Sequence, residues 1–468
     1  MALLTFHGAT RQVTGSCYLI EANGEKVLLE CGMTQGFRRD EQQNRNRFPF
    51  DPKTLSAVVI SHAHLDHSGL LPKLVAEGFS GSIYLTPDSA DLLGLMLKDA
   101  ANLQVRDVEW ENRWRQRAGK VPLKPLYVQA DTERALELCQ RIDYGTTTAV
   151  AKGIEISFHE AGHILGSAIV EMLVHEPHNL TRRLVFSGDL GSPNAPLLRD
   201  PAVLEEADLL LMESTYGDRN HRGRDETLQE LQAILDLAWA EGGNVLIPSF
   251  SVGRAQDLLY YLGKFYQAGT LKQQAVFLDS PMAIAATAIY DRYQHRYSDE
   301  DRSLLLDNDL HGRLQTWLPI LRCTESPDES MAINRVNSGA IIIAGAGMCN
   351  GGRIVHHFKH NLWRKECHVI FPGFQAKGTL GRRLVEGAQN VRVIHQNLAV
   401  KAQIHTLGGF SAHAGQSELI DWLRNFKRCP EIYLVHGEEE KSRALAAAIK
   451  EQLGWPANIP EQGEQIAF

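Results

Sequence analysis

A run of nine residues, Ser-His-Ala-His-Leu-Asp-His-Ser-Gly, holds the densest group of chemically capable side chains in this 468-residue chain. Its His62, His64, Asp66 and His67 directly follow the apolar stretch Ala-Val-Val-Ile, which predicts a central strand. Residues two apart on a strand project the same way, and imidazole and carboxylate groups are ligands that suit zinc. Burying so many polar groups unpaired would be costly, so the run predicts a metal site.

Three more candidate ligands stand where other apolar stretches end. His163 lies in Gly-His-Ile-Leu-Gly, Asp189 in Ser-Gly-Asp-Leu-Gly and His436 in Leu-Val-His-Gly-Glu. Loops at strand ends bring such side chains to one edge of a sheet. Taken singly, each is equally well a turn or capping residue, but beside the first run the three together favour metal ligation.

The elements that position these residues fall into two patterns. Before about residue 208, short glycine-bounded strands predominate, with helices predicted at 68–78 and at about 88–119. From about 213 to 391, strands alternate with helices predicted within 225–241, 254–267 and 283–297, which is typical of a parallel α/β unit. We therefore expect residues 1–208 and 396–468 to form one domain, with 209–395 inserted into it.

Composition narrows the function classes. The chain is 44% hydrophobic and 22% charged with a net charge of −8, so nucleic acid would need a local basic groove. Its seven cysteines form no Cys-x-x-Cys pair, which argues against a disulfide framework or a cysteine zinc site. No signal peptide and no apolar run of about 20 residues is apparent, so we expect a soluble, cytoplasmic protein.

Several motifs together resemble the metallo-β-lactamase superfamily: His-Ala-His-Leu-Asp-His, Gly-His-Ile-Leu-Gly-Ser-Ala, Ser-Gly-Asp-Leu-Gly and Val-His-Gly-Glu. Glu-Ser-Thr-Tyr-Gly-Asp-Arg and Phe-Ser-Ala-His-Ala further resemble its β-CASP branch, which processes nucleic acids. Within that branch the chain is similar to bacterial ribonucleases akin to the endonuclease subunit of the pre-mRNA cleavage and polyadenylation factor. The resemblance implies an α/β fold, namely a metallo-β-lactamase αββα sandwich with an inserted β-CASP α/β domain.

The resemblance also implies two zinc ions, although manganese or iron would accept the same ligands. It assigns His62, His64 and His163 to the first ion, Asp66, His67 and His436 to the second, and Asp189 to both. His413 is implied as the general acid and Glu213 as the residue that orients it, and Asp66 is counted with them as catalytic. One departure is Glu30, which stands where the superfamily's first motif usually has aspartate.

The resemblance predicts a zinc-dependent ribonuclease, and more narrowly an endonuclease. Two metals lower the pKa of a bridging water to about 7 and neutralise charge at phosphorus. RNA is favoured because RNA-acting members resemble this chain in having histidine at the position of His436, where DNA-acting members tend to have valine. Ser411 is a candidate for binding a non-scissile phosphate, and Arg353, after a glycine-rich loop, for binding another.

Three alternatives stay open. The same fold hydrolyses small esters, thioesters or lactams, although an inserted domain over the site argues against so small a substrate. A DNA nuclease is the second alternative, and a non-catalytic RNA-binding subunit is the third. RNA is the expected partner, no membrane is expected, and a homodimer is compatible with the sequence.

Overall fold

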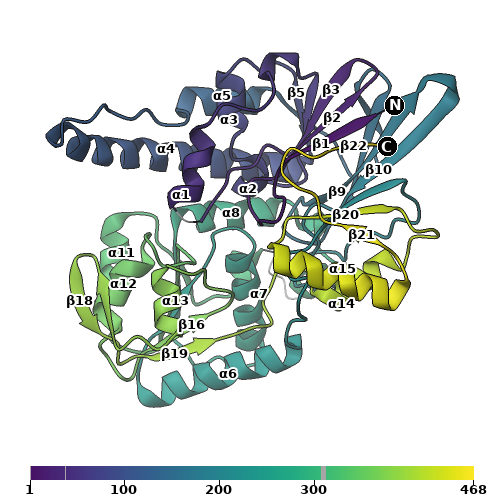
Figure 1. Ribbon diagram of the computed structural model, residues 1–468. Coiled ribbons are helices and arrows are strands. Elements are labelled where there is room, and N and C mark those ends of the chain that lie inside the picture. The colour runs from purple at the N-terminus through teal and green to yellow at the C-terminus, as the bar shows by residue number, and fades with distance from the viewer. Residues whose placement is uncertain (1, 37, 307–312) are drawn as a thin grey trace. The chain divides into compact units, whose positions relative to one another are not determined.

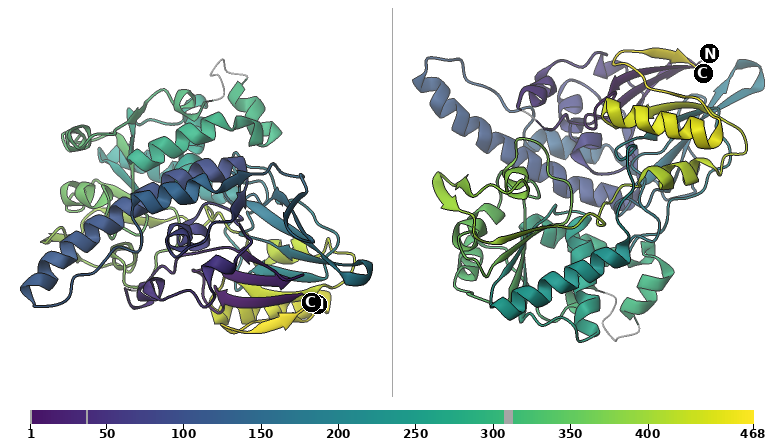
Figure 2. Two further views of the ribbon diagram at one scale, coloured as in Figure 1. Left: turned by 90° about the horizontal axis from the view of Figure 1, so that it is seen from above. Right: turned by 60° about the horizontal axis from the view of Figure 1, so that its bottom comes forward.

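The computed structural model describes residues 2–36, 38–306 and 313–468. They form two compact units: the first is Met1–Pro193, Asp200–Asn220 and His413–Phe468, and the second is Asn194–Arg199 and His221–Ala412. In the first unit the purple N-terminal strands and the yellow C-terminal segment lie side by side (Figures 1 and 2). This unit is therefore built from both ends of the chain.

The first unit contains two seven-stranded sheets. Sheet 1 has the order β22-β1-β2-β3-β4-β5-β6, with bounds β1 Leu3–Gly8, β2 Cys17–Ala22, β3 Glu25–Leu29, β4 Ala57–Val59, β5 Ser82–Leu85, β6 Cys139–Arg141 and β22 Gln465–Ala467. Sheet 2 has the order β21-β20-β11-β10-β9-β8-β7, with bounds β7 Thr148–Ala151, β8 Ile154–Glu160, β9 Ala168–Glu176, β10 Leu180–Phe186, β11 Leu209–Glu213, β20 Glu431–Val435 and β21 Ala457–Asn458. As predicted, β4 is a fully buried strand between two parallel neighbours.

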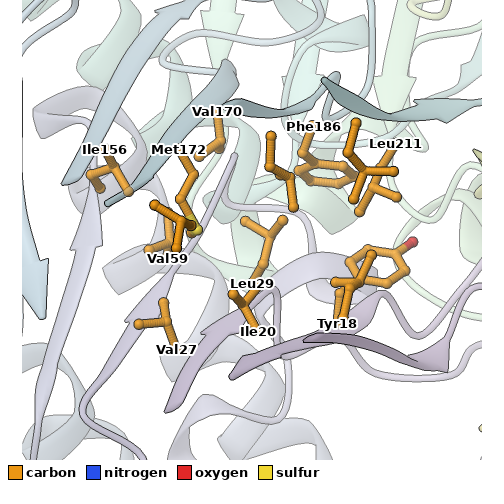
Figure 3. Packing of buried hydrophobic residues seen from close by; sticks show 14 of the residues in the cluster. Tyr18, Ile20, Val27, Leu29, Val59, Ile156, Val170, Met172, Phe186 and Leu211 are labelled. Carbon is orange, nitrogen blue, oxygen red and sulfur yellow. The ribbon is translucent and has the colours of Figure 1, made fainter. Parts of the chain in front are cut away.

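The two sheets pack face to face around one apolar core (Figure 3). Successive side chains of a strand point to opposite faces of the sheet, so every second residue contributes to this core. In β11, Leu209 and Leu211 face this core, while Leu210 and Met212 face the opposite way. Burial of each such side chain contributes about 1.5–3 kcal/mol to the free energy of unfolding. Figure 3 labels Tyr18, Ile20, Val27, Leu29 and Val59 from sheet 1 and Ile156, Val170, Met172, Phe186 and Leu211 from sheet 2.

Helices cover the outer faces of both sheets, which completes the predicted αββα sandwich (Figure 1). The apolar sides of α14 and α15 pack on sheet 2 through Leu419, Leu423 and Leu445. The helices of this unit are α1 Arg38–Glu41, α2 Leu65–Ser68, α3 Leu71–Ala76, α4 Pro87–Arg117, α5 Gln129–Glu137, α14 Gln416–Leu423 and α15 Glu439–Leu453, with 3₁₀ turns at Gln42–Arg45, Pro52–Thr54 and Pro177–Asn179. The single helix predicted at 68–78 is thus two short ones.

The second unit is a parallel α/β layer with sheet order β14-β13-β15-β12-β16-β19. Its strands are β12 Val245–Pro248, β13 Ala275–Asp279, β14 Leu321–Cys323, β15 Ala340–Ala344, β16 His368–Phe371 and β19 Gln403–Thr406, and β17 Asn390–Val393 pairs with β18 Gln396–Ala399. Its helices are α6 Arg224–Glu241, α7 Arg254–Gln267, α8 Pro281–Arg292, α9 Asp299–Leu306, α10 Leu314–Trp317, α11 Pro327–Ile333, α12 Ile354–Asn361 and α13 Leu380–Val385, with a 3₁₀ turn at Gln294–Arg296. The helix predicted at 283–297 ends early, at Arg292.

The compact units divide the chain at other points than the predicted boundaries of 209 and 395. Strand β11 pairs with β10 and β20, so the first unit retains the chain as far as Asn220. Strand β19 pairs with β16, so the second unit continues to Ala412. Among the described residues, no helix is long and apolar enough to span a membrane.

Candidate metal centre

Strand ends of the first unit bring the predicted ligands together. His62 and His64 follow β4, and Asp66 lies in the first turn of α2. His163 lies in the loop between β8 and β9, and His436 follows β20. His436 has a φ of +51°, a left-handed conformation that non-glycine residues rarely adopt and that tends to occur at functional sites.

The first ligand cluster is formed by three imidazoles and one carboxylate. His64 Nδ1 lies 3.1 Å from His62 Nε2 and 3.2 Å from His163 Nε2. Asp189 Oδ2 lies 3.6 Å from the Nε2 atoms of both His62 and His163. Ligands at about 2.0–2.1 Å from a tetrahedral zinc are about 3.3 Å apart, so these spacings fit a zinc ion.

The second cluster adjoins the first and shares Asp189. His67 Nε2 lies 3.1 Å from His436 Nε2 and 3.4 Å from Asp189 Oδ1. Asp66 Oδ2 lies 3.5 Å from His436 Nε2. Each oxygen of the Asp189 carboxylate thus faces a different cluster, which is the placement that a bridging ligand requires.

Two features indicate that these atoms are arranged to bind cations rather than to form hydrogen bonds with one another. His64 Nδ1 has either one proton or one lone pair, so it cannot form hydrogen bonds with both Nε2 atoms that converge on it. Asp189 Oδ1 is buried and has no hydrogen-bond donor among the described residues. A buried carboxylate oxygen without a donor is costly, and a metal ion would remove that cost.

Glu30 fixes the orientation of two of these histidines. It is fully buried, and its Oε1 accepts a hydrogen bond from Ser61 N–H at 2.6 Å while its Oε2 accepts one from Ser61 Oγ at 3.0 Å. Oε2 also forms a hydrogen bond with His67 Nδ1, and Ser61 Oγ lies 3.0 Å from His62 Nδ1. Both rings can therefore donate from Nδ1, which leaves each Nε2 with a lone pair for a metal. The extra methylene of Glu30 is accommodated, because the carboxylate reaches its partners.

The same principle holds at His436, whose Nδ1 lies 3.0 Å from Thr215 Oγ1. Thr215 donates its own proton to the His436 carbonyl at 3.0 Å, so its oxygen is free to accept from the ring. Ser61 and Thr215 did not stand out in the sequence. The only sequence signal for Ser61 is that it directly precedes His62, and the only one for Thr215 is that it lies two residues after Glu213.

Glu213 and His413 form a pair beside the two clusters. His413 Nδ1 lies 3.2 and 3.1 Å from the two oxygens of the fully buried Glu213, and Glu213 Oε1 also accepts from Leu190 N–H at 2.6 Å. The ring centroid of His413 lies 4.4 Å from that of His163. Burial lowers the pKa of His413, but the charges of Glu213 and Asp189 outweigh it and raise that pKa to about 9.

Asp66 keeps its negative charge in this setting. Burial acts to raise its pKa, but the hydrogen bond with His436 and the charge of His67 hold that pKa below its ordinary value. A permanently ionised carboxylate is the form that binds a metal.

The predicted phosphate-binding residues, Ser411 and Arg353, belong to the second unit. Arg353 donates from Nη1 to Asp279 Oδ1 at 2.6 Å and to the Thr324 carbonyl at 2.9 Å, and from Nη2 to the Glu325 carbonyl at 2.5 Å. Asp279 is fully buried, so Arg353 has a structural partner that the glycine-rich sequence did not reveal. Contact of Arg353 with a phosphate stays a prediction, as does that of Ser411.

Comparison with known proteins places this geometry in a family. Residues 10–249 match the model of the metallo-β-lactamase superfamily, which covers more than half of the chain. The chain belongs to the metallo-β-lactamase superfamily. Within it, residues 255–384 match the β-CASP domain and residues 397–460 match the Zn-dependent metallo-hydrolase RNA specificity domain. The resemblance stated from the motifs is confirmed, and so is the predicted enzyme class at the level of a metal-dependent hydrolase.

Individual relatives of this metallo-β-lactamase family member cover nearly all of it. A ribonuclease of Thermus thermophilus is 40% identical over 94% of this chain and 94% of its own length. Transcription termination factors of Methanocaldococcus jannaschii and Thermococcus kodakarensis are 32% and 31% identical over 97% and 99% of this chain, and 70% and 71% of their own lengths. A solved Enterococcus faecalis protein of unknown function, 13% identical with a TM-score of 0.57 over 100% of both chains, shares the fold alone.

Proposed function

We propose that the chain is a zinc-dependent ribonuclease that hydrolyses RNA phosphodiester bonds at a two-metal centre, with His413 as the general acid. The observation that carries this proposal is the shared carboxylate of Asp189, with one oxygen facing each of two adjacent ligand clusters. His62, His64 and His163 would hold one ion, and the second would be held by Asp66, His67 and His436.

Two metal ions in such a site lower the pKa of a water molecule and offset negative charge at phosphorus. The residues of the chain prepare the site for them. Glu30, Ser61 and Thr215 hold the imidazole rings in the tautomer that binds a metal, so little reorganisation accompanies binding. Five of the seven ligands are buried, which limits the access of competing water to them: His62, His67, His163, Asp189 and His436.

His413 has the features of a proton donor for the leaving ribose oxygen. Glu213 engages its Nδ1, so the proton available for transfer is on Nε2. The raised pKa, about 9, keeps the ring protonated at neutral pH. General-acid catalysis of this kind contributes about 10²–10⁴-fold in rate.

RNA is proposed over DNA and small esters on three grounds. A ribonuclease and a transcription termination factor are similar to this chain over 94% and 97% of its length. The match to an RNA specificity domain includes both His413 and His436. The second unit, His221–Ala412, is an α/β domain that a small ester would not require.

The test is cleavage of an end-labelled single-stranded RNA by zinc-loaded protein, with and without chelator, beside a DNA of the same sequence. We expect chelator-sensitive cleavage of RNA with DNA left intact, and the fragment ladder distinguishes internal cuts from trimming. His413→Ala should lose cleavage while keeping its metal, measured by plasma mass spectrometry. His175→Ala, a half-exposed histidine of the same unit, is the matched control and should behave as the parent. Equal cleavage of RNA and DNA, or cleavage that persists after complete removal of the metal, would contradict the proposal.

A further inference from the structure

Helix α4 continues well past the point where it packs on its own unit. Its first half is anchored by buried residues up to Ala101, and beyond that point only Val108 is buried. All three views show the outer half of the helix extending away from the sheets of the first unit (Figures 1 and 2). A helix of 31 residues is about 46 Å long, and its outer half buries little apolar surface.

The exposed end of α4 carries an unusual combination of side chains. Trp110 and Trp114 are 73% and 54% exposed, and they lie one helical turn apart on the same side. No acidic residue occurs between Arg113 and Lys124. We define the α4 tip as Trp110, Arg113, Trp114, Arg117, Lys120 and Lys124, all of them exposed.

Hydrogen bonds hold the α4 tip in shape. Asn112 donates to the Leu123 carbonyl at 2.9 Å and accepts from Leu123 N–H at 2.7 Å. Arg115 donates from Nε to the Val121 carbonyl at 2.7 Å. These bonds fold the segment that carries the two lysines back along the helix, and Lys120 Nζ lies 4.7 Å from the centre of the Trp114 ring.

The cations of the α4 tip have no acidic partners of their own. The neighbouring Arg115, which is not part of the α4 tip, forms an ion pair with Glu111 at 3.6 Å. Arg113, Arg117, Lys120 and Lys124 form no ion pair with any carboxylate of the described residues. In a chain of net charge −8, four unpaired cations beside two exposed indoles form a local surface that is complementary to a polyanion.

The other end of α4 is attached to the metal centre. Thr86 and Ser89, at its N-terminus, donate to the Gly166 carbonyl at 2.7 and 2.8 Å. Gly166 belongs to the same loop as His163, which it follows by three residues. The helix therefore starts at a ligand loop, and Trp110 lies about 35 Å from that start along its axis.

We propose that the α4 tip binds single-stranded RNA upstream or downstream of the cleavage site, with bases stacked on Trp110 and Trp114 and phosphates at the surrounding cations. This inference rests on the proposed function. Aromatic stacking tolerates any base, and arginine and lysine neutralise the backbone, which is how sequence-independent single-strand sites are built. A protein partner fits less well, because lysine, unlike tryptophan and arginine, is depleted at protein interfaces, and two of the four cations of the α4 tip are lysines.

The geometry sets a length requirement on the RNA. A stacked strand extends about 3.4 Å per nucleotide, so about ten nucleotides are needed to cover 35 Å. A 5-nucleotide RNA, about 17 Å long, cannot occupy the metal centre and the α4 tip together. The tip should consequently strengthen the binding of long substrates and have no effect on short ones.

The test compares Trp110→Ala/Trp114→Ala and Arg113→Glu/Arg117→Glu with the parent, all zinc-loaded, on unstructured 20- and 5-nucleotide RNAs. We expect KM for the 20-mer to rise at least about tenfold in each, with kcat unchanged and with both constants for the 5-mer unchanged. For the arginine variant, a plot of the logarithm of the RNA-binding constant against the logarithm of the salt concentration should also be shallower, with a slope smaller by about 1 to 1.5. Trp363→Ala, an exposed tryptophan of the second unit, is the matched control.

The outcomes separate this inference from the proposed function. If the parent cleaves neither RNA, the proposed function fails, and fluorescence anisotropy of the labelled 20-mer still measures whether the α4 tip binds RNA. An unchanged KM for the 20-mer in both double variants would overturn the inference. An equal loss of activity on both RNAs would also overturn it, because that indicates a structural defect. So would variants that change only the sedimentation of the protein, because that indicates that the tip joins two copies of the chain.

Discussion

Replacement of Glu30 by glutamine removes one charge and one acceptor from the centre of the ligand network while keeping its size. In the parent, Glu30 Oε2 accepts from both His67 and Ser61, and Oε1 accepts from Ser61 N–H. An amide offers a single oxygen, and its NH₂ group is itself a donor. With the amide oxygen at the Oε1 position, His67 loses the acceptor that keeps its proton on Nδ1. With the oxygen at the Oε2 position, the NH₂ group faces Ser61 N–H, and His67 keeps only an uncharged, weaker acceptor.

The expected consequence is a metal centre that binds its ions more weakly. Loss of a group that orients a metal-bound histidine typically lowers metal affinity about 10–100-fold. Glu30→Ala removes the buried partner altogether, and we expect it to lower the free energy of unfolding of the metal-free protein by about 3–5 kcal/mol as well. Glu30→Asp keeps the charge and the acceptors on a shorter side chain and should restore most of the affinity.

The assay is zinc titration against a competing chelator, with bound metal counted by mass spectrometry and folding followed by circular dichroism. The order of affinities predicted is parent, then Glu30→Asp, then Glu30→Gln. The reasoning is refuted if folded Glu30→Gln binds zinc as tightly as the parent, because the tautomer of His67 would then not depend on this carboxylate.

Three further predictions concern other parts of the molecule. If His413 is the general acid, its protonated form is the active one, so the rate should be maintained below its pKa of about 9 and fall above it, and the residual activity of His413→Ala should lack this alkaline decline. Gly166→Ala should lower the melting temperature and weaken metal binding, because Gly166 has a φ of +81° and an added Cβ would lie 2.5 Å from Ser89 N; a variant with the parent's melting temperature would contradict this. Arg353→Ala should destabilise the second unit by about 1–3 kcal/mol in urea unfolding, since buried Asp279 would lose one charged hydrogen-bond donor while keeping those of His357, Ser330 and Thr324; a loss of RNA affinity without loss of stability would instead assign Arg353 to the substrate.

Local sequence was sufficient for the elements whose pattern is strong. Helix α7 begins and ends where its apolar periodicity and glycines predict, at Arg254 and Gln267. The convergence of the proposed ligands could also be predicted, because a histidine or aspartate directly after an apolar strand lies where loops meet at one edge of the sheet. The structure brings the predicted ligand atoms into groups that lie within 4.8 Å of one another.

What the sequence did not reveal depends on partners far along the chain. Strand β11 looks like the start of the alternating region, yet it pairs with β20, more than two hundred residues later, and so belongs to the sandwich. The reach of Glu30 to His67 and the engagement of Arg353 with Asp279 are likewise matters of tertiary contact. No local pattern carries this information, because residue type alone does not say which distant group a side chain meets.

The most direct test of a two-metal ribonuclease is the rate of RNA cleavage as a function of metal bound per chain. Metal-free protein would be reconstituted stepwise with zinc, and bound metal and initial rate would be measured on the same samples. The shared carboxylate of Asp189 predicts little activity up to one ion per chain and a steep rise as the second ion binds. Full activity at one ion, or none at two in a folded protein, would contradict the account.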